Sequence, residues 1–231
     1  MSTLTYHDGQ ANVEAGPGHP FPVRVVGPAN LSGFKVAGSP VTADLSWRFA
    51  LEGKIYYCSD ADANDVVTGQ TSFVETTPTF LQVNPARSDK VLIPLLVNLC
   101  QTGTVAGGAI DVIGVLDRAD RYASAGTSEG VMNANTSING GNRVLLYSGA
   151  TATASVAGQH KRVDGVTLGQ DVSPAEGAVQ IYTWTPQSGI DLMFPGSSML
   201  WYTYAGTTGP TWFWTFKWLE LDLNDVRLEA V

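Results

Sequence analysis

Three histidines are the residues of this chain best suited to acid–base catalysis or metal binding. His7 and His19 lie in a polar lead-in rich in glycine and proline, and His160 lies in the loop-like segment Gly158-Gln-His-Lys-Arg-Val-Asp164. No His-x-His pair occurs, so neither the metal set of cupin-type β-barrel enzymes nor a Cys/His zinc site is expected. We expect His160 to be an exposed loop residue and not a catalytic base.

Carboxylates offer two further kinds of chemistry. The run Asp60-Ala-Asp-Ala-Asn-Asp65 resembles the start of a calcium loop, but its sixth position is Asp65 instead of glycine and its twelfth is Thr71 instead of glutamate. A plain turn is therefore the favoured interpretation. A glycosidase would need two acids facing one cleft, and spacing alone pairs none of the acids that are available. These are Asp111, Asp117, Asp120 and Asp191.

One string matches a nucleophile motif. Gly126-Thr-Ser-Glu-Gly130 has the spacing of the nucleophile elbow, which needs a strand before the serine and a helix after it. The residues that follow are poor helix formers, so we expect Ser128 to be a turn residue. No glycine-rich phosphate loop occurs either. The chain is therefore predicted not to be an enzyme and to have no catalytic residues, metal or cofactor; a sandwich hydrolase working with carboxylates is the least favoured alternative.

Aromatic side chains are concentrated in the last fifty residues, which hold five of the six tryptophans. On an extended strand, the rings from Trp212 to Trp218 at every second position share one face, and Phe213, Thr215, Lys217 and Leu219 share the other. The favoured interpretation is a core stripe, because large aromatic side chains are mostly buried. A subunit interface is the first alternative, and a sugar-stacking platform is the second.

The elements that must position these residues are strands. From Val91 to Leu99 only Pro94 and Asn98 interrupt the apolar run, so this strand should be covered on both faces, by a second sheet, a neighbouring subunit or both. Pro94 removes one ladder donor and favours an edge or a bulge. The candidate interface residues are Val91, Ile93, Leu95, Val97, Trp201, Trp212, Trp214 and Trp218.

Alternating apolar residues at Leu45, Trp47, Phe49 and Leu51 predict another strand, and Asn139-Gly-Gly-Asn142 is a hairpin-type signal. We expect little helix, because no stripe with a 3.6-residue period occurs. The fold predicted is an all-β antiparallel jelly-roll-like sandwich over residues 21–231, preceded by an extended arm over residues 1–20. Further strands are expected over residues 53–57, 73–83, 90–99, 108–117, 143–148, 179–184, 189–194, 198–205 and 211–221.

Composition excludes several partners. Charged residues make up 15% of the 231, and the net charge of −8 argues against nucleic acid, which needs clustered basic side chains. No apolar stretch reaches the roughly 18 residues of a membrane helix, and no secretory signal is expected, so no membrane partner is predicted. Cys58 and Cys100 are expected to be free thiols.

Residues 78 to about 140 carry a family resemblance. A strand with Leu92-Ile-Pro94 is followed by Gln101-Thr-Gly103, a second apolar strand ending Val115-Leu-Asp117, the segment Arg121-Tyr-Ala-Ser-Ala-Gly-Thr127, and an asparagine-rich stretch from Asn133 to Asn139. This order resembles jelly-roll structural proteins of tailed bacteriophages that decorate or reinforce the capsid. The resemblance implies a homo-oligomer, with a trimer favoured, which sits on the lattice of the major capsid protein.

The function expected is therefore that of a structural virion protein on the capsid surface, made in the host cytoplasm. The alternative is a carbohydrate- or receptor-binding module of a phage tail or fibre, in which exposed tryptophans would stack on sugars. Fold alone does not decide between the two.

Overall fold

The computed structural model of the chain describes residues 5–7, 12–14, 45–60, 65–102, 109–169, 180–186 and 191–226. The chain divides into two compact units, Met1–Arg48 and Phe49–Val231. In the first unit, β1 (Thr5–His7) pairs antiparallel with β2 (Asn12–Glu14). The extended arm predicted over residues 1–20 stays a prediction, because most of those residues lie outside the described part.

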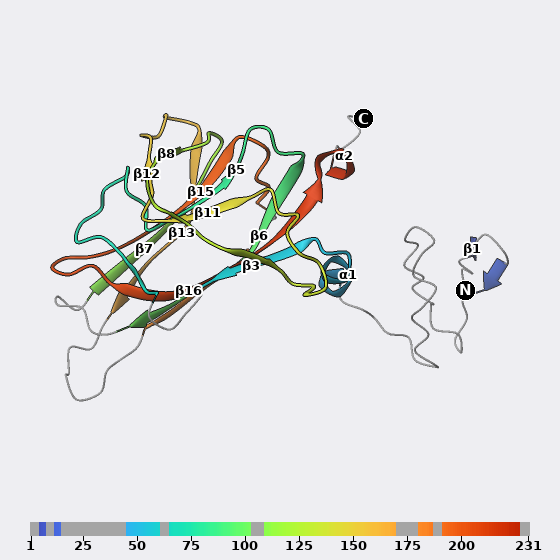
Figure 1. The fold of residues 1–231 in the computed structure, drawn as a ribbon, viewed down its shortest axis with the longest axis horizontal. Coiled ribbons are helices and arrows are strands. Elements are labelled where there is room, and N and C mark those ends of the chain that lie inside the picture. Colours follow the sequence, from blue (N-terminus) through green and yellow to red (C-terminus); the bar gives the residue numbers. More distant parts are fainter. Residues whose placement is uncertain are drawn as a thin grey trace. The chain divides into compact units, whose positions relative to one another are not determined.

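The second unit is built on two six-stranded sheets (Figure 1). The first sheet has the order β10 (Val131–Asn133), β3 (Ile55–Ser59), β16 (Thr211–Asp222), β6 (Lys90–Thr102) and β14 (Ile181–Trp184), and β4 (Val67–Thr68) also pairs with β16. The second sheet has the order β13 (His160–Gly169), β7 (Ala109–Asp117), β15 (Ser197–Ala205), β5 (Phe80–Asn84), β11 (Leu145–Ser148) and β9 (Thr127–Ser128). Neighbouring strands in both sheets are antiparallel.

The connectivity is that of a jelly roll. Its eight framework strands, in chain order, are β3, β5, β6, β7, β13, β14, β15 and β16. The first sheet holds the first, eighth, third and sixth of them side by side, and the second sheet holds the second, seventh, fourth and fifth. Every connection between consecutive framework strands therefore crosses from one sheet to the other, except that from β7 to β13, which are neighbours in the second sheet. This is the double Greek-key pattern. The predicted all-β sandwich fold is confirmed.

Aromatic rings from both sheets fill the space between them. Phe80 on β5 packs against Trp214 and Phe216 on β16, with ring centroids 5.3 and 5.2 Å apart. Trp201 on β15 contacts Trp184 on β14, at 5.5 Å. Pairs of this geometry add to the stabilisation that comes from burying the rings themselves. The core stripe predicted for the last strand is confirmed, since the rings at 212, 214, 216 and 218 are all buried.

The long strand β6 runs through the middle of the first sheet, between β16 and β14. Its pairing with β16 shifts register between Lys217 and Trp218, so that Leu96 and Pro94 face consecutive residues of β16 and Leu95 is extra. Pro94 therefore lies at a bulge, where a missing ladder donor costs least.

Residues 118–159 form an excursion between β7 and β13. They extend both sheets with β10, β11 and β9 and add a small sheet of β8 (Tyr122–Ser124) and β12 (Thr151–Ala152). The outer face of the second sheet carries its own apolar cluster, to which Ala150 and Ala152 of this excursion belong. We call this outer surface the roofed face; its residues are Leu81, Val83, Ile113, Val115, Tyr147, Leu200 and Tyr202.

The prediction of a strand at Leu45 to Leu51 is wrong, because this segment is the helix α1 (Leu45–Leu51). Trp47 and Leu51 lie four residues apart on one helical face and are 69% and 52% exposed. Seven residues are too few for apolar alternation to distinguish the period of a strand from that of a helix. A second short helix, α2 (Leu223–Val226), follows β16.

Three further expectations need correction. The loop expected around His160 is the start of the ten-residue strand β13, whose exposed residues gave no apolar alternation. The strand expected over residues 189–194 is reduced, in its described part, to a single bridge between Met193 and Leu92. Asn139 to Asn142 do not close a hairpin, because β10 and β11 on either side belong to different sheets.

Candidate functional site

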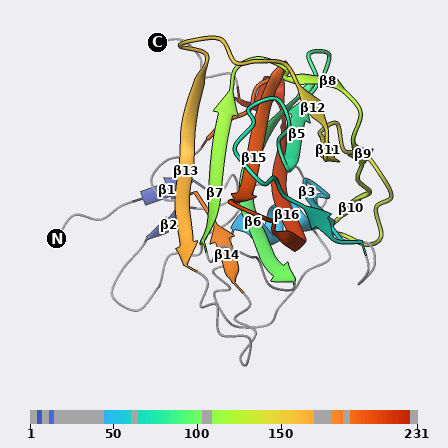
Figure 2. The same ribbon diagram turned by 90° about the vertical axis from the view of Figure 1, so that its left-hand side faces the viewer.

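A hollow of about 640 Å³ lies at one end of the second sheet. The antiparallel register sets Asp117 at the end of β7 opposite both His160 at the start of β13 and Ser198 near the start of β15. Figure 2 shows these three strand ends together at the top of the sheet. The hollow is lined by residues of these strand ends and of the turns that precede β13 and β15: Leu116, Asp117, Arg118, Gly158, Gln159, His160, Lys161, Asp191, Leu192, Phe194, Pro195 and Ser197.

One backbone hydrogen bond and one contact of the His160 ring hold two walls of the hollow. The Arg118 amide donates to the Gln159 carbonyl at 3.0 Å, which closes the end of the β7–β13 pair. The His160 ring Nδ1 lies 3.3 Å from the Val156 carbonyl oxygen. These bonds fix where the Arg118, Gln159 and His160 side chains leave the backbone.

The third wall is a tight turn before β15. Gly196 has φ of 85°, a conformation that favours glycine, and its amide donates to the Asn84 carbonyl at 2.8 Å. The Ser197 hydroxyl donates back to the Phe194 carbonyl at 2.6 Å. The turn thus holds Phe194 at the hollow, although this ring is 47% exposed.

Both carboxylates of the hollow are engaged. Asp191 forms an ion pair with Lys161. The Asp117 carboxylate accepts hydrogen bonds from the Ala119 amide at 2.9 Å and from the Arg121 guanidinium at 2.8 Å. Arg118 forms no ion pair with any residue in the described part of the chain, and its side chain is exposed. As far as the described residues go, the hollow therefore combines acids that are paired with cations and one guanidinium that is not paired with an acid.

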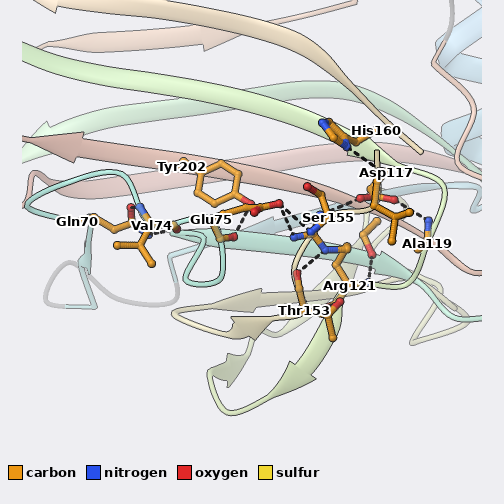
Figure 3. A network of polar contacts seen from close by, with 12 residues as sticks. Gln70, Val74, Glu75, Asp117, Ala119, Arg121, Thr153, Ser155, His160 and Tyr202 are labelled. Atoms are coloured by element: carbon orange, nitrogen blue, oxygen red, sulfur yellow. Dashed lines mark hydrogen bonds and ion pairs between the residues drawn. The ribbon is translucent and has the colours of Figure 1, made fainter. Parts of the chain in front are cut away.

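Arg121 is the centre of a polar network behind the hollow (Figure 3). Its side chain is only 3% exposed, and besides Asp117 it contacts Glu75 at 3.3 Å and donates to the Thr153 carbonyl at 2.6 Å. Asp117 belongs to β7, whereas Glu75 and Thr153 belong to segments that cover the roofed face. The Arg121 guanidinium thus bonds the segments that cover the roofed face to β7 of the sheet.

Glu75 is held from other sides as well. The Ser155 amide donates to the Glu75 carboxylate at 2.8 Å, and the Tyr202 hydroxyl donates to the Glu75 carbonyl at 2.8 Å. Hydrogen bonds from Ser155, with a smaller contribution from Arg121, lower the pKa of Glu75. The segment from Asp117 to Gly126 thus carries a buried guanidinium with three partners, namely Asp117, Glu75 and the Thr153 carbonyl.

The carboxylates considered for catalysis are not brought together as a free pair. Asp120 accepts from the Tyr122 amide at 3.0 Å, and the Asp111 carboxylate accepts from the Thr167 hydroxyl. Ser128 lies in β9, and strand β10 follows it instead of the helix that a nucleophile elbow requires. His160 is exposed, as expected.

Among the described residues, no group of three or more histidine, cysteine or acidic side chains could hold a metal ion. Residues 61–64 of the calcium-like run lie outside the described part. Cys58 and Cys100 are free thiols, as predicted, with Cys58 buried and Cys100 half-buried. Within the described ranges, no helix has the length and apolar character needed to cross a membrane.

Six of the eight candidate interface residues lie in the interior: Val91, Val97, Trp201, Trp212, Trp214 and Trp218 are each at most 4% exposed. Ile93 and Leu95 are half-buried. Buried rings offer no surface to a partner or a sugar, so a role in contacts outside the chain remains open only for Ile93 and Leu95. The accessible positions are the neighbours that alternate with the core residues.

Those neighbours form what we call the open face, the outer surface of the first sheet. Cross-strand pairs place Lys217 between Tyr57 and Leu96, and Phe213 beside Cys100, which also faces Ile181. Ile181 and Met132 are 64% and 61% exposed. None of the residues of this face is buried: Tyr57, Ser59, Leu96, Asn98, Cys100, Met132, Ile181, Thr183, Phe213, Thr215 and Lys217. The sequence carried this signal, because an aromatic stripe at every second residue leaves the intervening residues on the other side.

Comparison with known proteins adds no relative. No family model matches the chain, and neither a curated protein nor a solved structure matches it.

Proposed function

We propose that this chain is a structural virion protein that assembles as a homo-oligomer and decorates or stabilises a bacteriophage capsid. The resemblance of residues 78–140 to capsid-decorating proteins supports the proposal. So does the jelly-roll connectivity, an architecture that virus structural proteins use, although lectins use it too.

The observation that carries the proposal is the open face. It places Leu96, Phe213 and Ile181 next to hydrogen-bonding side chains such as Asn98 and Thr215, a mixture typical of subunit interfaces. Five strands about 4.8 Å apart, each contributing about five residues of about 3.3 Å, give a footprint on the order of 400 Å². This is about half of the roughly 800 Å² that each partner buries in a standard interface. The occupant we propose is a second copy of this chain.

Sedimentation velocity at micromolar concentration tests this assignment. The wild type should sediment as a single oligomer, with a trimer expected, and Ile181→Asp should sediment as a monomer because its carboxylate would be buried in the interface. Val156→Asp is the matched control, since Val156 is 54% exposed and lies outside the open face. A wild-type monomer that also fails to co-sediment with shells of the coat protein from the same genome would contradict the proposal.

A second candidate function is a carbohydrate- or receptor-binding module. It is favoured by the hollow at the β7–β13 end, where Phe194 is exposed beside polar side chains. Binding to a glycan array that depends on Phe194 would support it.

A further inference from the structure

We propose that the hollow at the β7–β13 end binds an acidic sugar, a pyranose that carries a carboxylate. This inference rests on the second candidate function, whose ligand class it specifies, and it concerns a surface separate from the open face, so it does not depend on the capsid role. It rests on three properties of the hollow: its size, its apolar wall and its uncommitted cation.

The size suits a small ligand. A volume of about 640 Å³ falls within the roughly 300–1,000 Å³ of small-molecule sites. Its lining residues come from three neighbouring strand ends and two turns that the backbone hydrogen bonds hold in place. Strand pairing and turn hydrogen bonds place these residues before a ligand binds, which lowers the ordering cost of binding.

The apolar wall suits the carbon face of a sugar ring. Phe194, Leu192 and Pro195 lie together in the turn before β15, and Phe194 is 47% exposed although the turn bonds hold its backbone. An exposed aromatic ring at a hollow offers a flat apolar surface at little cost in conformational entropy. Inorganic phosphate would gain nothing from this wall, whereas a pyranose would cover it.

The polar wall suits an anion. Asp191 is neutralised by Lys161 and Asp117 by Arg121, which leaves the guanidinium of Arg118 without an acid among the described residues. Arginine binds a carboxylate through two parallel hydrogen bonds, and Gln159 at the same rim adds an amide for sugar hydroxyls. A local cation on a chain of net charge −8 also concentrates anions where the rest of the surface repels them.

Titration followed by NMR tests the proposal with three probes: glucuronic acid, glucose and inorganic phosphate. Glucuronic acid should bind with a Kd on the order of 1 mM, at least about tenfold more tightly than glucose or phosphate. Arg118→Gln should reduce its affinity to that of glucose, and Phe194→Ala should abolish binding of both sugars. Near-ultraviolet circular dichroism should be unchanged in both variants.

Two variants serve as controls. Phe73→Ala removes another ring that is 47% exposed, and Arg143→Gln removes an exposed guanidinium that lies outside the hollow. Neither should alter binding. Equal affinity for glucuronic acid and glucose would contradict the proposal that the ligand is acidic. Equal affinity for glucuronic acid and phosphate would contradict the proposal that the ligand is a sugar. Absence of binding by every probe, or loss of binding in a control variant, would overturn the site itself.

Discussion

The outer surfaces of the two sheets differ although the sheets share one core. On the roofed face, Leu81, Leu200 and Tyr202 are buried beneath the excursion of residues 118–159 and the segment that carries Glu75. On the open face, Leu96 and Phe213 are only half-buried and Ile181 is largely exposed. In the described ranges, the chain thus supplies its own cover for the second sheet and leaves apolar area accessible on the first. This difference indicates which side of the sandwich is suited to a partner.

The largest expected effect comes from removing the Arg121 guanidinium, which bonds the segments that cover the roofed face to β7. Arg121→Met should lower the free energy of unfolding by about 3–5 kcal/mol, because the buried Asp117 carboxylate would lose its counter-charge. Urea denaturation of the two proteins gives the difference. The matched control is Arg143→Met, whose exposed pair with Asp89 should contribute nothing measurable. Equal effects of the two substitutions would show that Arg121 does not hold the covering segments on the sheet.

Truncation of one leucine on each face compares the faces directly. Leu200→Ala on the roofed face should cost about 2–5 kcal/mol, because it opens a cavity in a closed cluster. Leu96→Ala on the open face should cost clearly less, about 1 kcal/mol, when measured below the concentration at which the protein associates. A Leu96→Ala variant as unstable as Leu200→Ala would mean that the open face is already covered within the chain.

Two glutamates should respond to pH in opposite directions. The pKa of Glu75 is lowered by hydrogen bonds, so its stabilising contribution is present above the ordinary glutamate pKa and is lost as the pH falls through the folded value. The pKa of Glu220, in β16, is raised by burial, so the free energy of unfolding falls as the pH rises from the ordinary value through the raised one.

Unfolding measured between pH 7 and pH 3 separates the two contributions. Glu75→Gln should lose less stability on acidification than the wild type, because it lacks the contribution of Glu75 that is lost at low pH. Glu220→Gln should lose more, because it lacks the contribution of Glu220 that is gained as the pH falls. The Glu220 carboxylate also accepts from the Arg143 amide at 2.9 Å and from the Trp218 indole at 2.9 Å, so its substitution should lower stability at every pH. Parallel curves for the three proteins would contradict both assignments.

Much of the framework could be predicted from sequence. The apolar run at Val91 to Leu99 and the aromatic stripe from Trp212 to Trp218 marked the two longest strands of the first sheet, because burial on one or both faces leaves a period that sequence preserves. Strand β13 was not predicted as a strand, because an exposed edge strand does not need apolar residues at every second position. The helix α1 was missed because its short pattern fits two periods.

The surfaces could be predicted less well than the core. The sequence pattern selected the most apolar residues as candidate contacts, and the fold buries such residues, so Trp201 and Trp212 lie in the core. The network of Arg121, Asp117 and Glu75 joins residues up to 46 positions apart, and the hollow joins three strand ends. Only the sheet register brings such residues together, and local spacing does not encode it.

Alkylation of the two thiols tests most directly whether the open face is an interface between copies. Cys100 lies on that face, whereas Cys58 is buried in the core, where burial raises its pKa to about 12 and suppresses the thiolate, so it serves as an internal control. If copies associate through the open face, Cys100 should react quickly in dilute protein and slowly at micromolar concentration, while Cys58 stays unreactive throughout. A Cys100 rate that does not change with protein concentration would contradict the assignment.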